Sequence, residues 1–281
     1  MTEEDSTPPY RSIGSPHAEA EGLPLGGRPL SRMRLALVTG GHRRLGAAIS
    51  LALARAGHAL AIHGSHDVEM SGDLSDALRE CGAVWDGFVT DFNDLDAAEE
   101  LVAEVAVKFG RPPDILVNCA AMFGQDRLES VTPESLMQHY AINCAAPILL
   151  TKAFSTVPSG ASDRCVINIL DQRIAQPHGD QLAYTVSKQA LAGFTQAAAR
   201  SLAPRVRVNA VAPGLTIATD DYADGQMERL AAQMPLQCLP QPDQIADAVC
   251  YLAGASAVTG QVIYVDGGAH MCSYDRDFMH L

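Results

Sequence analysis

Residues 35–46 read LALVTGGHRRLG: a short apolar run, a turn with two adjacent glycines, and the start of a segment with helical character. At Gly40 and Gly46 there is no Cβ to hold a ligand away from the backbone. A strand that passes through such a turn into a helix directs backbone N–H groups and the positive helix end toward the phosphates of a dinucleotide. The stretch therefore predicts a phosphate-binding turn. A tight strand-to-helix turn that binds nothing is the alternative.

Beyond this turn, short runs rich in Val, Ile and Leu alternate with longer helical segments from Met33 onward. Such uniformly apolar runs are typical of strands buried on both faces of a parallel sheet. The expected strands span residues 35–39, 59–63, 85–89, 115–118, 165–170, 206–211 and 261–265, and the expected helices span 45–56, 74–81, 95–109, 133–155, 182–202, 225–233 and 242–252. This alternation predicts one Rossmann-like α/β domain over residues 33–270, a doubly wound sheet of about seven parallel strands with helices on both faces. Its ligands are expected beyond the carboxyl ends of the strands.

The two ends of the chain lie outside this expected domain. Residues 1–32 open with acidic residues and carry Pro and Gly, which predicts a disordered tail. Residues 271–281 form a C-terminal extension that is longer than the fold needs. We expect the extension either to reach a neighbouring subunit, including its active site, or to fray.

The overall composition excludes several classes of protein. The 20 Lys and Arg stand against 33 Asp and Glu, and the net charge of −13 provides no basic field for nucleic acid. No window approaches the roughly 18 uninterrupted apolar residues of a membrane span. The 7 cysteines form no C-x-x-C pair and are typical of reduced thiols. We therefore expect a cytoplasmic protein that binds neither nucleic acid nor a membrane.

Tyr184 and Lys188 lie one turn apart in the expected helix 182–202, so the phenol and the ammonium share one face. A free tyrosine has a pKa of about 10, and a neighbouring cation lowers it by favouring the phenolate. This arrangement would make Tyr184 a usable acid near neutral pH. A Tyr and a Lys at this spacing are also common by chance, which leaves an ordinary surface helix as the alternative.

Further motifs follow in a fixed order along the chain. They are Asp91 after the third expected strand, Asn118 and Ala120 after the fourth, Asn143 in a helix, Pro213-Gly214 after the sixth strand, and Val265-Asp266-Gly267-Gly268 near the end. With the glycine turn and the Tyr184/Lys188 pair, this order resembles the short-chain dehydrogenase/reductase family over about residues 33–270.

The resemblance assigns a role to each of these residues. It implies that Tyr184 donates a proton, that Lys188 lowers the pKa of Tyr184 and holds the nicotinamide ribose, and that Asn143 supports a water-linked proton path. For the cofactor it implies that Asp91 hydrogen-bonds the adenine and that Asn118 and Ala120 line the side of the adenosine ribose. It also implies that the segment with Pro213, Gly214 and Thr216 lies along the nicotinamide and pyrophosphate. It also implies a homotetramer.

Two positions depart from the general family pattern. Asp171 stands thirteen residues before Tyr184, where the family usually has a serine; a serine hydroxyl can donate to a carbonyl, whereas an ionised carboxylate only accepts. Asp171 suits a substrate that presents N–H donors, or a reaction in which a proton is relayed to a ring nitrogen. Arg44 replaces a glycine of the turn, and its guanidinium would meet phosphate oxygens and the substrate ring. Arg43, Leu45 and Gly46 of the same turn are also expected to contact the cofactor.

These departures resemble the pteridine reductase branch of the family, which includes the dihydromonapterin reductases. In that branch an aromatic residue after the Asn-x-Ala segment stacks the pterin against the nicotinamide, and Phe123 occupies this position. A planar ring held there would gain about 0.5–1.5 kcal/mol beyond its area burial. Ordinary packing beneath a loop is the alternative for Phe123. Asp220, Asp221 and Asp224 lie in the segment that usually forms a substrate lid, and a solvated face is equally expected.

The end of the second strand bears on the choice of cofactor. His63, Ser65 and His66 carry no carboxylate that would repel a 2′-phosphate, which favours NADPH, whereas Asp67 keeps NADH as an alternative. His63 and His66 have no Cys or carboxylate pattern to complete a zinc site, so no metal is expected.

Taken together, the residues predict an NADPH-dependent oxidoreductase that transfers hydride to a C=N bond of a small, pterin-like heteroaromatic substrate of the dihydropteridine or dihydrofolate type. Tyr184 would be the proton donor, and Asp171 would assist it. The alternative is a reductase of a carbonyl, quinone or sugar. A regulator that senses NADPH without turnover is a third interpretation.

Overall fold

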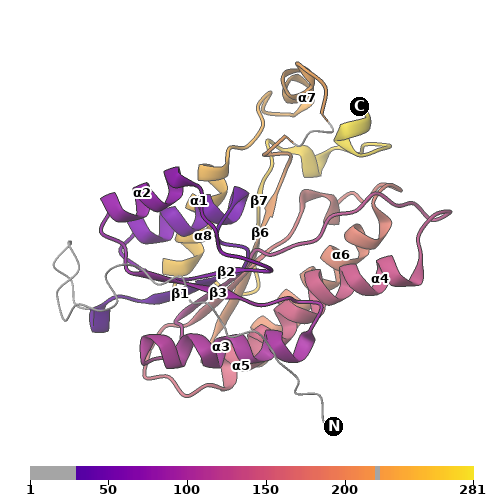
Figure 1. The fold of residues 1–281 in the computed structure, drawn as a ribbon. Helices are drawn as coiled ribbons and strands as arrows, with labels where there is room; N and C mark the ends of the chain where they lie inside the picture. The colour runs from indigo at the N-terminus through magenta and orange to yellow at the C-terminus, as the bar shows by residue number, and fades with distance from the viewer. Residues whose placement is uncertain (1–29, 219–221) are drawn as a thin grey trace, which may run out of the picture.

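Seven parallel strands form one sheet in the computed structural model, which describes residues 30–218 and 222–281 (Figure 1). The strands are β1 (Leu35–Val38), β2 (Ala59–Gly64), β3 (Trp85–Val89), β4 (Ile115–Asn118), β5 (Cys165–Ile169), β6 (Arg207–Pro213) and β7 (Val262–Val265). Their order is β3-β2-β1-β4-β5-β6-β7, with β1 paired to β2 from Leu35↔Ala59 and to β4 from Ala36↔Ile115. The direction of winding reverses between β1 and β4, where a doubly wound sheet binds its ligands. The predicted sheet is thus confirmed.

Helices cover both faces of the sheet. They are α1 (Arg44–Arg55), α2 (Gly72–Glu80), α3 (Leu95–Phe109), α4 (Pro133–Tyr140), α5 (Ala146–Thr156), α6 (Leu182–Leu202), α7 (Gln226–Gln233) and α8 (Pro242–Gly254). The layer with α1, α2 and α8 and the layer with α3, α5 and α6 lie on opposite sides of the sheet (Figure 1).

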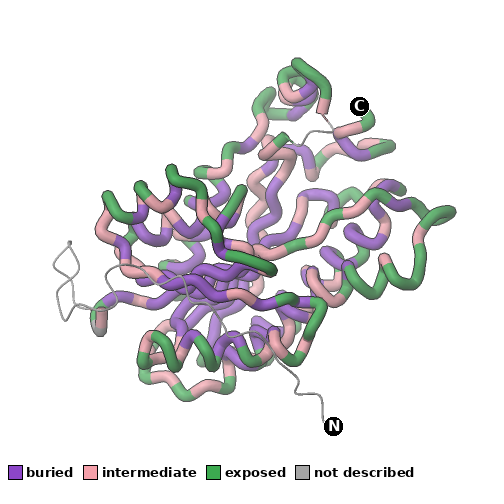
Figure 2. The backbone as a smooth tube through the Cα atoms, viewed as in Figure 1, coloured by how far each residue is buried: buried purple, intermediate pink, exposed green. Residues whose placement is uncertain are grey.

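Alternate side chains of β1 enter these two layers, which explains why the strand is apolar throughout. Leu35 and Leu37 pack with α3, α5 and α6, whereas Ala36 and Val38 pack with α1, α2 and α8. All four residues are fully buried, and the strands form the buried interior in Figure 2. Burying each leucine contributes about 1.5–3 kcal/mol.

One predicted helix, residues 133–155, is interrupted. Between α4 and α5 the chain forms a π-helical turn, Ala141–Ala145, that contains Asn143. Pro147, at the start of α5, has no N–H to donate to the carbonyl of Asn143 four residues earlier, so the α-helical ladder is broken here. The other bounds differ from the predicted ones by at most two residues.

The two ends differ from their predicted state where the structure describes them. Leu30–Arg32 form a 3₁₀ turn, and Leu30 packs on the core, so order begins before Met33. Residues 1–29 of the predicted tail, and Asp220 and Asp221 of the predicted lid, lie outside the described residues. Within residues 30–218 and 222–281, no helix has the length and apolar character needed to cross a membrane.

The C-terminal extension does not fray. It folds back beside α7, where Phe278 is buried with Leu230, Met234 and Ala269 (Figure 1). The extension therefore lies against the carboxyl edge of its own sheet.

Candidate active site

A cavity of about 930 Å³ opens beyond the carboxyl ends of the strands. Its walls come from the glycine turn, from the loops after β2, β3, β4, β5 and β6, from α6 and from the C-terminal extension. The predicted site residues that line it are Gly40, Arg43, Arg44, Leu45, Gly46, His63, Ser65, His66, Asp91, Ala120, Phe123, Asp171, Tyr184, Lys188, Pro213, Gly214 and Thr216. The topology thus gathers residues from the whole predicted domain into one site.

The glycine turn is held against the loop that follows β4. Gly40 has a φ of 63°, and a Cβ added there would lie 3.1 Å from Ala120 Cα. A Cβ at Gly46 would collide with the carbonyl oxygen of Gly40. Thr39 Oγ1 accepts hydrogen bonds from the N–H groups of Cys119 and Ala120, each at 3.0 Å. Glycine is therefore required at both positions by the close approach of the backbone.

Arg44 also has a positive φ, 50°, a conformation that glycine adopts at little cost and an arginine rarely adopts. This agrees with its prediction as a replacement for a glycine. Its side chain is exposed at the cavity beside Arg43. The two cations therefore lie where a phosphate group could reach them.

His63 lines the cavity and also joins two backbone segments, while its contact with the cofactor stays a prediction. Its Nδ1 accepts from Gly40 N–H at 3.2 Å, and its Nε2 lies 2.8 Å from Thr90 O, to which it donates in this tautomer. The ring is 1% exposed and stacks on Phe92 at 4.3 Å, and burial lowers the pKa of His63 to about 4. A neutral ring with both nitrogens engaged positions the glycine turn and offers no charge to a phosphate.

Ser65 and His66 lie at the outer edge of the same wall. His66 is exposed and Ser65 is half-buried, so both can meet a ligand. Asp67 is exposed and lies with its Oδ1 3.8 Å from His42 Nε2, and it is not among the described residues that line the cavity.

Tyr184 and Asp171 form a direct pair at the centre of the cavity. Asp171 follows β5, Tyr184 lies in the first turn of α6, and Tyr184 Oη donates to Asp171 Oδ2 at 3.1 Å. Asp126 helps to place this turn, because its carboxylate accepts from Ala183 N–H at 3.1 Å. The sequence spacing of thirteen residues thus becomes a hydrogen bond.

The predicted lowering of the tyrosine pKa by Lys188 is wrong for this geometry. Burial and the Asp171 carboxylate raise the pKa of Tyr184 well above 10, and Arg173 offsets only part of this. Lys188 Nζ donates to Ile169 O at 2.8 Å and lies 5.7 Å from the centre of the Tyr184 ring. Burial lowers the pKa of Lys188 to about 8. Tyr184 therefore remains protonated at neutral pH.

Arg173 is a site residue that the sequence interpretation missed. It is 4% exposed, and its Nε lies 3.2 Å from Asp171 Oδ1. Its guanidinium carbon lies 5.1 Å from the centre of the Tyr184 ring and 5.7 Å from that of Phe123. Burial alone would lower the pKa of Arg173, but Asp171, Tyr184 and Asp277 raise it above its usual value. Its place two residues after Asp171 was the available signal.

Asn143 and Asn118 lie behind the cavity wall. Asn143 Oδ1 accepts from Met122 N–H at 2.7 Å, while its Nδ2 donates to Met122 O and to Ser187 Oγ. Asn118 Nδ2 donates to Asn168 Oδ1 at 2.8 Å. The described contacts of Asn143 therefore position the loop before Phe123, and the predicted roles in a proton path and at the ribose stay predictions.

Phe123 lies at the mouth of the site with 49% of its surface exposed. Its ring meets that of Tyr184 edge to face, with 4.8 Å between the centres. A flat apolar surface is therefore offered to the cavity beside the hydroxyl of Tyr184.

A cavity at the switch point of a doubly wound sheet, with a glycine turn on one wall and a Tyr–Lys pair on another, defines an oxidoreductase that works with a dinucleotide. Residues 41–270 match the family model described as enoyl-(acyl carrier protein) reductase. The chain belongs to the short-chain dehydrogenase/reductase family.

Its relatives carry different substrate names. The 3-oxoacyl-[acyl-carrier-protein] reductase FabG of Staphylococcus aureus (strain Mu50) is 32% identical over 252 residues, which covers 84% of this chain and 98% of that one. The (3R)-3-hydroxyacyl-CoA dehydrogenase of Rattus norvegicus is 31% identical over 252 residues, 85% and 97% of the two chains. Among solved structures, FolM alternative dihydrofolate reductase 1 from Brucella canis, complexed with NADP, matches with a TM-score of 0.80 and 31% identity over 86% of this chain and 95% of that one.

Proposed function

We propose that this protein is an NADPH-dependent reductase of a C=N bond in a pterin-like heterocycle. The observation that carries the proposal is the 3.1 Å hydrogen bond from Tyr184 Oη to Asp171 Oδ2. A carboxylate beside the tyrosine hydroxyl can accept hydrogen bonds from substrate N–H groups and can relay a proton. A serine in its place would not ionise near neutral pH and could not relay a proton in this way. The name of the Brucella neighbour, a dihydrofolate reductase, supports the same substrate class.

The cofactor site fits NADPH. The glycine turn and Arg43 and Arg44 face the cavity, as do Ser65 and His66, whereas Asp67 lies toward His42. These groups can bind a 2′-phosphate, and Asp67, the carboxylate next to His66 in the sequence, is not among the described residues that line the cavity. The NADP complex of the Brucella neighbour supports this choice.

The chain's own residues supply the proton side of the reaction. NADPH, when bound, supplies the hydride to the ring carbon of the C=N bond. Tyr184 Oη donates its proton to the ring nitrogen, so that the C=N bond becomes CH–NH. Asp171, bonded to the same hydroxyl, relays a solvent proton back to Tyr184. Lys188 would hold the nicotinamide ribose. Phe123 orients the flat substrate.

A screen of substrates against both cofactors tests the proposal. We expect purified protein to oxidise NADPH faster than NADH with dihydrobiopterin, dihydromonapterin or dihydrofolate, followed by nicotinamide absorbance. Brisk reduction of simple ketones with no turnover of any pterin would contradict it. The second candidate, a carbonyl reductase, is favoured by the names of the Staphylococcus and rat relatives, and the screen therefore includes a 3-oxoacyl thioester.

Replacing Arg44 by glycine separates its binding role from its backbone strain. Glycine adopts a φ of 50° without strain, which stabilises the folded state, but it also raises the conformational entropy of the unfolded chain, which destabilises the folded state. These two effects nearly cancel, so the free energy of unfolding should change by no more than about 1 kcal/mol. Loss of the guanidinium should raise the Kd for NADPH by about ten-fold and the Kd for NADH by much less. Fluorescence titration with both cofactors and thermal unfolding measure these effects. Equal weakening of both cofactors would show that Arg44 does not contact the 2′-phosphate.

The homotetramer and the cytoplasmic location are proposals of the same kind. Leu136, Met137 and Tyr140 of α4 and Val186 of α6 are exposed apolar residues that a second subunit could cover, and light scattering tests this. The cysteines are free, as expected in a reducing compartment, and fractionation of cells tests the location.

A further inference from the structure

The C-terminal extension is anchored at two points next to the active site. Phe278 fills an apolar cluster with Leu230 and Met234. Gln226 Nε2 donates to the carbonyl oxygens of Phe278 and Met279 at 3.1 and 3.2 Å. The anchored segment therefore holds Asp277 at a fixed place in the cavity wall.

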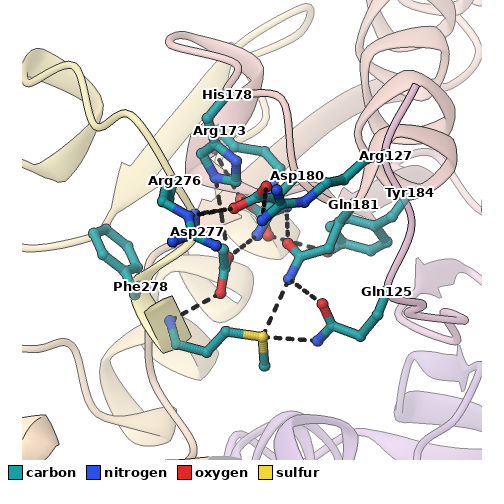
Figure 3. Close-up of polar contacts among 12 residues, drawn as sticks. Gln125, Arg127, Arg173, His178, Asp180, Gln181, Tyr184, Arg276, Asp277 and Phe278 are labelled. Carbon is teal, nitrogen blue, oxygen red and sulfur yellow. Dashed lines mark hydrogen bonds and ion pairs between the residues drawn. The ribbon is translucent and has the colours of Figure 1, made fainter. Parts of the chain in front are cut away.

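Asp277 is 4% exposed and pairs with Arg173 (Figure 3). Arg173 Nη2 donates to Asp277 Oδ2 at 2.7 Å. The backbone N–H of Asp277 donates to Asp180 Oδ2 at 3.1 Å, and Asp277 Oδ1 accepts from Met279 N–H at 3.0 Å. A buried carboxylate with these bonds has little freedom to turn.

The guanidinium of Arg173 is fixed along three directions. Its Nε meets Asp171, its Nη1 donates to Gln181 Oε1, and its Nη2 meets Asp277. Because the guanidinium is a planar fork, holding its tip at Asp277 also sets the direction in which Nε meets Asp171. Asp171 Oδ1 is occupied by this contact and by Arg173 N–H, which leaves Oδ2 to accept from Tyr184.

We propose that Asp277 is a positioning residue for the reaction, which acts through Arg173 to hold the Asp171 carboxylate in line with the Tyr184 hydroxyl. The inference rests on the proposed function, because it concerns the same proton donor. Without Asp277, the guanidinium of Arg173 is free to rotate and to draw both oxygens of Asp171 away from Tyr184. The extension is thus a working part of the active site.

The test compares Asp277→Asn with Asp275→Asn, an exposed neighbour on the same segment that serves as the matched control. We expect Asp277→Asn to lower kcat by about ten- to hundred-fold, as a small misplacement of a catalytic group does, with the Kd for NADPH unchanged. Asp277→Glu, which restores the carboxylate, should recover part of the lost kcat. Asp275→Asn should behave as the wild type.

A second measurement needs no substrate and so separates this inference from the proposed function. The groups that face Asp277 are Arg173, His178 and Asp180, and Asp180 is faced in turn by Arg127, Arg276 and His280. The groups that act on Tyr184 are Asp171, Arg173, Lys188 and Asp277. The charge of Asp277 helps to raise the pKa of Tyr184, so its removal should shift the phenol titration to lower pH. Ultraviolet difference titration, with Tyr184→Phe as the blank, records this shift. The same change in the Asp171→Asn background separates the two causes: the inference expects a smaller shift there, because part of the effect passes through Asp171, whereas an equal shift in both backgrounds shows only the direct effect of the Asp277 charge. Neither outcome depends on whether the substrate is a pterin.

Other outcomes would overturn the inference. An Asp277→Asn protein with full kcat and an unshifted titration shows no positioning role. A parallel loss of kcat, NADPH binding and thermal stability that Asp277→Glu does not reverse shows a structural role alone. Should the Asn variant fail to fold, Arg173→Lys decides: it keeps the charge but lacks the fork, and full kcat in that variant would refute the argument.

Discussion

Tyr184→Phe is expected to lower kcat for reduction by roughly 10²–10⁴-fold, the usual contribution of a positioned proton donor. The change removes one oxygen from a side chain that is 7% exposed and leaves the ring packed against Phe123. The fold and the cofactor site should therefore persist. Steady-state kinetics, thermal unfolding and NADPH titration measure the three properties separately.

The pH dependence provides the control for this variant. Tyr184 keeps its proton to high pH, whereas Lys188, with its pKa lowered to about 8, loses its positive charge as the pH rises through that value. NADPH binding should therefore weaken above about pH 8 in the wild type and in Tyr184→Phe alike. A Tyr184→Phe protein with the wild-type kcat would show that Tyr184 is not the proton donor.

Asp171→Ser is expected to lower kcat/KM for a pterin by about 100-fold or more, while kcat/KM for a simple ketone stays the same or rises. Serine supplies a donor to a carbonyl oxygen but cannot accept from substrate N–H groups as a carboxylate does or relay a proton at neutral pH. The ratio of kcat/KM for dihydrobiopterin and for a ketone measures the change in preference.

Asp171→Asn is the matched control for that experiment. It keeps the size of the side chain and an oxygen that can accept from Arg173, but it carries no charge. Pterin reduction should fall in this variant as well, without any gain on ketones. An Asp171→Ser protein that reduces pterins at the wild-type rate would remove the main support for the proposed substrate class.

Local patterns were sufficient to predict most of the fold. Strands of a parallel sheet that is covered on both faces are mostly apolar, so the seven short runs rich in Val, Ile and Leu could be recognised as strands. The break in the predicted helix 133–155 was not predicted, because the segment keeps a helical period on both sides and only Pro147 marks the break. In the folded chain, Asn143 of the π-helical turn donates to Met122 O, and this contact joins two different segments of the chain.

The site divides in the same way. Gly40 was predicted from the glycine turn that follows a strand, and Asp171, Tyr184 and Lys188 were predicted from the resemblance to the short-chain dehydrogenase/reductase family. Parallel strands bring their carboxyl ends to one edge, so all four residues line one cavity. His63 lines the cavity, but its bonds to Gly40 and Thr90 could not be predicted, since these partners lie on two other segments.

The sequence by itself determined the doubly wound sheet and the glycine turn, because these depend on periodicity and on spacing within one segment. The role of Tyr184 as proton donor came from the family resemblance and stays a prediction. Only the tertiary structure decided that the pKa of Tyr184 is raised, because Asp171 and burial outweigh Lys188. It also brings Asp277, 104 residues after Arg173, to 2.7 Å from the guanidinium of Arg173. Burial and charge pairing arise between segments far apart in the chain, and spacing along the chain does not encode them.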